Sequence, residues 1–414
     1  MSRLGVAMGL CTALAVLAVA CSPATTGAVD QVTLQVLLAD DWSSTAIVAD
    51  AVRAFEAEHP NVRVQLDGAP FSQTIGDAEA AIAAGNPHDV VQWHAFAAGA
   101  RGSAEPVDDL WEAYLDAKEF IPGALEDVTW AEVRYGVPLD TNALVLVLNE
   151  DALLAADIDP ASLVDFAGVR AAADAVGQPD DGIRGMAVAA SSWVTYGWIR
   201  TNGGEIIEVD EDGNVTFLLD DPQTVGALDF LAGMIEDEIA WPPYGTNFQQ
   251  DLVGLFLAGS APIHPSGSWD YALVGQGPEN FGVVLEPMPS NAPNAGTVLG
   301  GSSMFIPAGS EHRELAFEFM VHLIDDEYML RQAQEYGRLP ARRGLFDNPF
   351  FADPAYQMVA QELERASVMR LIAYPEAADA FAQAIEDVFR GRLSAADALA
   401  QAQTRAEQAL AAET

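Results

Sequence analysis

The polar triplet Gln92, Trp93 and His94 closes the stretch GNPHDVVQWHAF, directly after two valines that predict a short buried strand. An imidazole beside an amide can act as a general base, or it can hydrogen-bond the hydroxyl groups of a ligand. Strand ends of α/β sheets expose such side chains to ligands. A second interpretation stays open here, in which His94 is a satisfied helix-capping or core histidine.

Catalytic patterns are missing from the rest of the sequence. It contains no HExxH, GxSxG, Walker loop or dinucleotide fingerprint, and the six histidines are scattered. Carboxylate pairs could serve a glycosidase, but 61 acidic residues make chance pairs abundant. We therefore expect no catalytic residue, no metal site and no cofactor.

Aromatic residues recur in polar, loop-like contexts at the ends of the expected elements. Wide rings beside polar groups suit pyranose sugars, whose C–H faces pack on aromatic rings while their hydroxyls need hydrogen-bond partners. Each ring taken alone fits a core position equally well, and only the recurrence favours a site. These residues are Trp42, Trp93, Trp193, Tyr196, Trp198, Trp241, Tyr244, Trp269 and Tyr271.

The N-terminus predicts export. A short basic start and an apolar run are typical of a secretory signal peptide, and the run ends in AVAC, which resembles the bacterial lipoprotein signal. We expect residues 1–20 to be removed, Cys21 to be lipidated and residues 21–31 to form a flexible tether. An ordinary signal peptide cleaved nearby is the alternative. The mature chain keeps one cysteine, so we expect no internal disulfide.

The charge balance restricts the partners. The formal net charge is −42, and Lys118 is the only lysine. Such a surface repels nucleic acid and anionic membranes, so we expect neither as a partner, apart from a lipid anchor. The acidity is explained either by solvation in salty or alkaline surroundings or by a site for cationic ligands.

Hydrophobic periodicity predicts an α/β protein. Residues 32–38 and 62–66 alternate as half-buried strands around an amphipathic helix over 47–60, the spacing of a βαβ unit. Asn142 to Asn149 reads as one strand that is buried on both faces. Ser394 and Asp397 form a capping-box pattern before the last helix. About 390 mature residues predict two domains. Further predicted elements are helices over 75–84, 248–259 and 314–324 and strands over 89–91, 261–263 and 302–307.

Several ordered segments together resemble the family 1 extracellular solute-binding proteins of bacterial ABC importers, which mostly bind carbohydrates. The likeness runs from about residue 32 to the C-terminus. The segments are GNPHDVVQW, YGVPLDTNALVLVLNEDAL, WIRTNGGEII, FLAGSAPIHPSGSW, VLEPMP, GGSSMFIPAGSEHRELAFEFMVHLI, GRLPARR and GRLSAADALAQAQTRAEQAL.

The resemblance implies a two-lobe periplasmic-binding-protein-like fold with a ligand cleft between discontinuous α/β domains. Lobe 1 would comprise residues 32–141 and 297–331, and lobe 2 residues 142–296 and 332–414. The protein would be a monomer outside the cytoplasm, anchored by lipid to the cell membrane or periplasmic. It would deliver a mono- or short oligosaccharide to ABC permease subunits without catalysis. Alternatives are a cationic ligand such as a polyamine, or a secreted glycan-processing enzyme.

The resemblance also implies a set of ligand-binding residues. Gln92 and His94 match the Gln-x-His-Ala run of aldose binders, in which both side chains contact sugar hydroxyls. The DTNALV form, in contrast, is closer to oligosaccharide and glycerol-phosphate relatives, although one lysine in the chain disfavours a phosphate ligand. Arg338 fits a structural ion pair equally well. The full set is Asp41, Trp42, Gln92, Trp93, His94, Asp140, Thr141, Asn142, Trp193, Tyr196, Tyr244, Trp269, Asp270, Gly300, Gly301 and Arg338.

Overall fold

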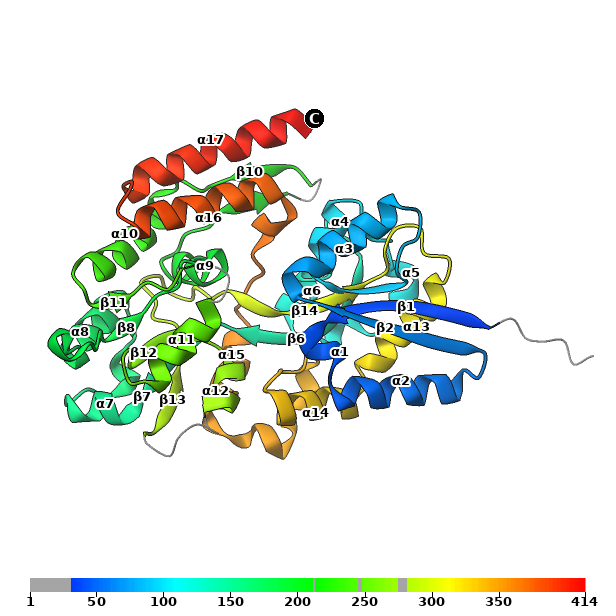
Figure 1. The fold of residues 1–414 in the computed structure, drawn as a ribbon, viewed down its shortest axis with the longest axis horizontal. Coiled ribbons are helices and arrows are strands. Elements are labelled where there is room, and N and C mark those ends of the chain that lie inside the picture. The colour runs from blue at the N-terminus through cyan, green and yellow to red at the C-terminus, as the bar shows by residue number, and fades with distance from the viewer. Residues whose placement is uncertain (1–30, 211–212, 245–247, 275–280, 414) are drawn as a thin grey trace, which may run out of the picture.

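The computed structural model describes residues 31–210, 213–244, 248–274 and 281–413. The expected signal peptide and Cys21 lie outside these residues. Within the described ranges, no helix is both long enough and apolar enough to cross a membrane. Two five-stranded sheets, each covered by helices, form two lobes that lie side by side (Figure 1). The predicted two-lobe α/β architecture is thereby confirmed.

The sheet of lobe 1 has the strand order β2-β1-β3-β14-β6. Strand β1 runs parallel to both of its neighbours, whereas β14 runs antiparallel to β3 and to β6. The predicted strand, helix and strand at the start of the chain form a parallel βαβ unit. The bounds are β1 Val32–Ala39, β2 Val62–Ala69, β3 Val90–Trp93, β6 Gly136–Ala143 and β14 Leu299–Phe305.

Helices of lobe 1 cover both faces of this sheet. Thr45 begins the first long helix, because its hydroxyl accepts a hydrogen bond from the Val48 amide at 3.2 Å. Ala51 and Phe55 lie on the buried face of that helix. The helices of this lobe are α1 Asp40–Ser43, α2 Ala46–Glu58, α3 Phe71–Ala83, α4 Ala95–Ala100, α5 Asp108–Tyr114, α6 Pro122–Glu126, α13 Arg313–Leu323 and α14 Asp326–Tyr336.

The sheet of lobe 2 has the order β11-β8-β12-β7-β13, in which β7 is antiparallel to β12 and β13. Successive residues of β7 face different hydrophobic clusters: Val145 and Val147 lie in one, Leu146 and Leu148 in the other. This confirms the prediction of a strand buried on both faces. The bounds are β7 Val145–Asn149, β8 Met186–Ala187, β11 Ala240–Trp241, β12 Ile263–Ser266 and β13 Val283–Glu286.

The prediction that residues 142–149 form one strand was wrong, because they belong to two strands. The chain leaves β6 at Ala143 and enters β7 at Val145, in the other sheet. Leu144 between them is fully buried. A continuous apolar run hides such a crossing, because both sheets bury their central strands and the hydrophobic pattern does not change.

Lobe 2 is completed by a helical layer in which the C-terminal helices pack together. Ser394 caps the last helix as predicted: its hydroxyl oxygen accepts from the Asp397 amide at 3.1 Å. The helices of this part are α7 Glu150–Ala155, α8 Phe166–Val176, α9 Ser192–Thr201, α10 Pro222–Glu236, α11 Phe248–Leu257, α12 Ser268–Val274, α16 Pro375–Phe389 and α17 Ala395–Glu413. Helix α15 Pro354–Leu363 contacts β6 of lobe 1 and β13 of lobe 2. A hairpin of β9 Ile207–Val209 and β10 Val215–Phe217 lies beside α17.

Three segments link the lobes: Leu144, the residues before β14, and residues 364–374, where Ser367 pairs with Val298. The predicted boundary after Arg331 falls inside α14, and Met329 and Ala333 on either side of it both pack in the first hydrophobic cluster. The division of the chain into 32–141 with 297–331, and 142–296 with 332–414, therefore stays a prediction.

Replacing Gly301 by alanine is expected to destabilise the protein by about 2 to 4 kcal/mol. Gly301 has φ +103°, and an added methyl group would overlap the Asp140 carbonyl and lie 2.7 Å from the Thr141 Cα. Gly76→Ala in α3 is the control, since nothing lies within 4 Å of its added Cβ; it should be neutral or stabilising by up to about 1 kcal/mol. Urea unfolding measures both, and equal effects would contradict this account of Gly301.

Candidate functional site

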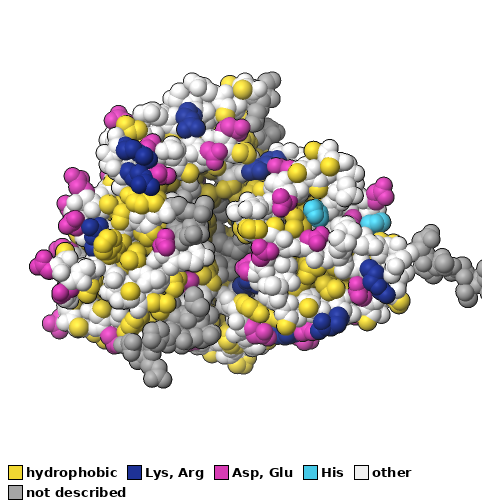
Figure 2. Space-filling view, viewed as in Figure 1, with side chains coloured by type: hydrophobic (Ala, Val, Ile, Leu, Met, Phe, Trp, Pro, Cys, Tyr) yellow, Lys and Arg dark blue, Asp and Glu magenta, His cyan; other side chains and the backbone are white. Residues whose placement is uncertain are grey.

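Residues at the strand ends of lobe 1 meet the edge of lobe 2 at β14. Asn142 on β6 pairs in register with Gly300 on β14. A Cβ at Gly300 would lie 3.0 Å from the Trp193 ring of lobe 2. The surface is hollowed along the line between the lobes (Figure 2). Polar groups of lobe 1 and the Trp193 indole of lobe 2 therefore meet at β14, and the hollow between the lobes is the interlobe cleft.

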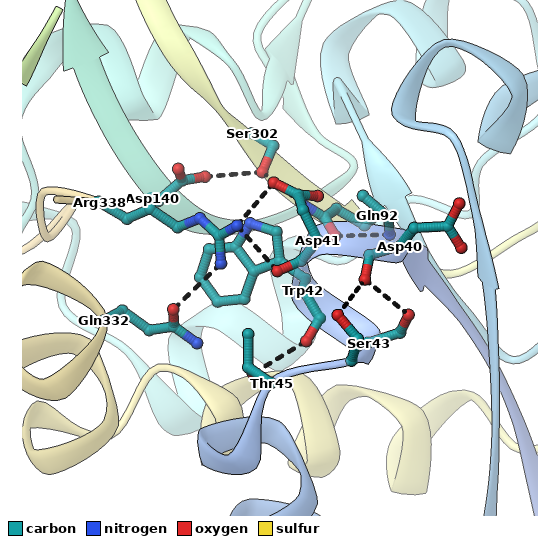
Figure 3. A network of polar contacts seen from close by, with 12 residues as sticks. Asp40, Asp41, Trp42, Ser43, Thr45, Gln92, Asp140, Ser302, Gln332 and Arg338 are labelled. Carbon is teal, nitrogen blue, oxygen red and sulfur yellow. Dashed lines mark hydrogen bonds and ion pairs between the residues drawn. The ribbon is translucent and has the colours of Figure 1, made fainter. Parts of the chain in front are cut away.

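Arg338 organises the lobe 1 side of the cleft. Its Nη2 donates to the Asp41 carboxylate at 2.6 Å and its Nη1 to the Gln332 amide oxygen at 3.1 Å. The guanidinium lies over the Trp42 ring at 4.5 Å (Figure 3). Because the Asp41 side chain is 68% exposed, water screens the ion pair, and the stacked indole supplies much of the attraction. Arg338 therefore forms the structural contacts that were one of its two predicted roles.

Asp140 lies beside this group, within β6. Its Oδ1 accepts a hydrogen bond from the Ser302 hydroxyl at 2.7 Å, while the residue stays partly exposed. Burial raises the pKa of this carboxyl to about 6, against the opposing effects of the Ser302 hydrogen bond and the Arg338 charge. Asp140 is consequently a carboxyl group that can gain or lose a proton near neutral pH.

Gln92 is buried and hydrogen-bonded inside lobe 1, an environment that differs from its predicted role as a ligand contact. Its Oε1 accepts from the Ala39 amide and its Nε2 donates to Ser302, both at 2.9 Å, and the side chain is buried. Thr141 is likewise buried, with its hydroxyl bonded to the Pro340 carbonyl at 3.0 Å. Neither side chain has hydrogen-bonding capacity that faces the cleft.

His94 pairs with a residue that the sequence analysis did not identify. Its Nδ1 lies 2.6 Å from Oδ1 of Asp127, a buried carboxylate just after α6. The imidazole is 20% exposed, and it contacts the Phe71 ring edge-on at 5.5 Å. Among the described residues, no hydroxyl or thiol hydrogen-bonds the other ring nitrogen, Nε2. His94 is thus an oriented imidazole with one nitrogen available, and it lacks a nucleophile to activate.

Trp193 and Trp269 form the lobe 2 side of the cleft. Their ring centroids lie 5.8 Å apart, and both residues are partly exposed. The Trp193 indole N–H donates to the Leu299 carbonyl at 3.0 Å, which ties lobe 2 to the start of β14. The Trp269 indole N–H is buried and has no partner in the described part of the chain. An unpaired buried donor at a cleft wall is a position where a ligand acceptor would be stabilised.

Hydrogen bonds of the neighbouring residues Ser268 and Asp270 fix the backbone around Trp269. Ser268 donates its hydroxyl to the Asn142 side chain at 2.7 Å, which links the start of α12 to β6. Asp270 accepts a hydrogen bond from the Ser266 hydroxyl, and burial raises the pKa of Asp270 to about 6. Gly267 is required here, since any Cβ would overlap the Trp269 ring.

Three predicted aromatic residues do not line the cleft with these indoles. Trp93 is buried in lobe 1 under the Arg101 guanidinium. Tyr196 is buried in the lobe 2 cluster, where its hydroxyl donates to Glu205 and burial raises its pKa. Tyr244 bonds the Phe389 carbonyl at the end of α16. Trp93 and Tyr244 make packing contacts, whereas Tyr196 also lines a pocket between the lobes.

A separate pocket of about 590 Å³ lies between the lobes near the β9–β10 hairpin. It is lined by charged groups of both lobes, including Glu126, Arg200, Glu205 and Arg370. Arg200 donates to Glu205 at 2.7 Å. Tyr196, one of the predicted ligand-binding residues, lines this pocket, whereas Trp193, Trp269 and Asp140 do not. The indole pair and Asp140 are the candidate site because they combine stacking faces with hydrogen-bonding groups.

Asp127, Ser268 and Ser302 are the site residues that sequence analysis missed. Ser302 sits in the GGSSM segment next to two predicted glycines, and Ser268 sits between Gly267 and Trp269. Both could have been found from these neighbours. Asp127 carries no sequence signal, because its pairing with His94 depends on how α6 meets β3. Among the described residues, no group of three or more His, Cys, Asp or Glu side chains could hold a metal ion.

Comparison with known proteins places the fold among transport receptors. Residues 50–358 match the family model of a bacterial extracellular solute-binding protein. The galactooligosaccharide-binding protein of Bacillus subtilis is 24% identical over 82% of this chain and 81% of its own length. The GacH receptor of Streptomyces glaucescens, known with acarbose, superposes with a TM-score of 0.78 at 19% identity, covering 92% of this chain and 99% of its own.

UgpB of Mycobacterium tuberculosis, in complex with glycerophosphocholine, superposes with a TM-score of 0.79 at 17% identity. It covers 92% of this chain and 99% of its own. Structural likeness at these identities establishes the fold and leaves the ligand undetermined.

Asp270→Asn is expected to stabilise the ligand-free protein by about 1 to 3 kcal/mol at about pH 8 and by less at about pH 4.5. The pKa of Asp270 is raised to about 6 in the folded state, so the folded protein holds this proton more tightly than the unfolded chain. Stability therefore falls as pH rises from about 4 to 6, and the amide removes that loss. Urea unfolding at both pH values measures the difference. Asp379→Asn, at an exposed position of α16, is the control and should have little effect at either pH. If Asp270→Asn changed the stability equally at both pH values, this account of Asp270 would be contradicted.

Proposed function

The chain belongs to the bacterial extracellular solute-binding proteins, and we propose that it is the carbohydrate-binding component of an ABC importer. It would bind a mono- or short oligosaccharide in the interlobe cleft and deliver it to membrane permease subunits. Lobe closure around the ligand is a hinge motion about the linking segments. The ligand is released unchanged, so no catalytic residue or cofactor is required.

The paired indoles of Trp193 and Trp269 carry this proposal. Two partly exposed rings 5.8 Å apart offer apolar faces to the C–H surface of a sugar. In lobe 1, Asp140 and the partly exposed His94 imidazole supply groups that accept or donate hydrogen bonds. Apolar faces on one side and hydrogen-bonding groups on the other match the two kinds of surface of a pyranose ring.

The available charges favour a neutral ligand over an anionic one. Arg338 is already bound by Asp41, Gln332 and the Trp42 ring. Lys118, the only lysine, is in a short turn after α5. Beside Asp140, a phosphate group would therefore meet a carboxyl group and an arginine that Asp41 already binds.

We assign direct ligand contacts to Trp193, Trp269, His94, Asp140 and Asn142. Trp42, Asp41 and Arg338 shape the lobe 1 wall, and Gly300 and Gly301 let β14 approach both lobes closely. Asp270 supports Trp269 from behind. These assignments rest on the partial exposure of Trp193, Trp269, His94 and Asp140. Asn142 is buried and its side-chain oxygen already accepts from Ser268, so it would contact a ligand through its amide nitrogen.

The cellular context follows from the N-terminal pattern and the charge. Processing before Cys21 and lipidation of that cysteine would anchor a monomer to the outer face of the cell membrane. The net charge of −42 disfavours nucleic acid and anionic lipid surfaces. Mass spectrometry of the mature N-terminus tests the anchor, and an unmodified N-terminus would contradict it.

Thermal-shift screening tests the ligand class, because a ligand that binds only the folded state raises the melting temperature. The panel contains glucose, galactose, short α- and β-linked oligosaccharides, putrescine and spermidine. Stabilisation by a carbohydrate supports the proposal. Stabilisation by polyamines alone would replace it with a cation receptor, and cleavage of the oligosaccharides during incubation would indicate an enzyme.

Trp269→Ala and His94→Ala are each expected to abolish carbohydrate stabilisation while the ligand-free protein still folds. At a ligand concentration about 100 times Kd the wild type gains about 2.7 kcal/mol, which both variants should lose. The first loses a stacking face and the second a hydrogen-bonding group.

Trp241→Ala is the matched control for the tryptophan variant. Trp241 is also partly exposed in lobe 2, but it stacks with Arg184 at 4.2 Å and bonds the Ser260 carbonyl, outside the cleft contacts. It should melt at a lower temperature and keep the full ligand response. Normal carbohydrate binding by both cleft variants would show that the site lies elsewhere.

A further inference from the structure

We infer that Ser302, held by Gln92, is the positioning residue that aims the Asp140 carboxylate at the ligand. On this view, which rests on the proposed function, Gln92 affects binding through Ser302 and Asp140 without touching the ligand. The inference stands on a chain of hydrogen bonds that joins four of the five strands in the sheet of lobe 1, from β1 to β6.

The direction of every bond in this chain is determined. The Ala39 amide on β1 can only donate, so the Gln92 side chain on β3 receives that bond at its oxygen, at 2.9 Å. Its amide nitrogen must then donate to the Ser302 oxygen on β14, at 2.9 Å. The single hydroxyl proton of Ser302 is left to donate to Asp140 on β6, at 2.7 Å (Figure 3). Bonds aligned in one direction polarise and strengthen one another.

The bond from Ser302 makes the two carboxyl oxygens of Asp140 different. Oδ1 is occupied by Ser302, and Oδ2 has no hydrogen-bond partner in the described part of the chain. Because Ser302 needs an acceptor, a proton on Asp140 resides on Oδ2. This atom therefore accepts from a ligand hydroxyl when the carboxyl is ionised and donates to the ligand when it is protonated.

Charged groups around Asp140 oppose one another. Arg338, from the loop after α14, favours the ionised carboxylate. Asp41 of α1 and Asp127, after α6, favour the protonated form, and Asp127 is itself bonded to His94. The Ser302 hydroxyl is the only hydrogen-bond donor to Asp140 that the described residues supply. Its removal should thus change both the direction of the carboxyl group and its titration.

The backbone of β14 explains why Ser302 reaches Asp140. The register between β14 and β6 shifts between Ser302 and Ser303, and such bulges redirect a side chain. Gly301 just before the bulge lacks the Cβ that would overlap the Asp140 carbonyl. Ser303 turns the other way, where its hydroxyl accepts from the Ala95 amide at 2.8 Å. Two adjacent buried serines therefore serve different sides of the sheet.

The adjacent serines provide a matched pair for the decisive experiment. Ser302→Ala and Ser303→Ala remove the same atom from neighbouring buried positions, but only the first contacts Asp140. The Asp140 titration is followed by ¹³C NMR in ligand-free protein with labelled aspartate, and Asp140→Asn identifies its signal. We expect Ser302→Ala to move the titration midpoint upward from about 6. Ser303→Ala should lower the melting temperature and leave the Asp140 titration midpoint unchanged.

The ligand arm uses the carbohydrate that gives the greatest stabilisation in the screen. Ser302→Ala should weaken its affinity about tenfold and shift the pH profile of binding upward, while Ser302→Thr, which retains the hydroxyl, restores both. An unchanged Asp140 titration in Ser302→Ala would overturn the inference. If no carbohydrate binds the wild type, the proposed function fails, and the ligand-free titration still decides the role of Ser302.

Discussion

The insertion of β14 between β3 and β6 is the constraint on which the rest of the molecule depends. This strand returns from lobe 2 and runs antiparallel to both neighbours, so it completes the first sheet and fixes one of the linking segments. Its first residues contact Trp193, and its centre carries Gly301 and Ser302. The indole wall and the carboxylate wall of the cleft are both positioned from this one strand, which couples their spacing to the hinge.

Buried polar groups near the cleft lower the stability of the ligand-free protein. Asp140 and Asp270 lose hydration on burial, and both have a pKa raised to about 6 as a result. The buried indole N–H of Trp269 has no partner in the described residues. Each of these groups costs free energy in the ligand-free protein, and a ligand that pairs with Asp140 or with the Trp269 N–H recovers part of that cost.

Arginine contacts show how so acidic a protein remains compact. Arg338, Arg331 and Arg200 each bridge segments that are distant in sequence or lie on different elements, through carboxylates that are partly exposed. Such exposed pairs are screened by water and contribute little individually. The hydrophobic clusters of the two lobes supply the folding free energy, and the excess acidic charge stays on the surface.

The sequence by itself determined the local elements and the class of protein. Alternating valines and leucines specify β1 and β2, the Ser394 cap starts α17, and the ordered motifs indicated the family and the two-lobe fold. These features depend on neighbours within a few residues, which a sequence displays directly. The tertiary structure alone decided the switch of sheets at Leu144, the pairing of His94 with Asp127, and the burial of Tyr196. It also turned Gln92 from a presumed ligand contact into a support for Ser302. These outcomes depend on which distant side chain fills the neighbouring space, and the order of residues along one strand does not contain that information.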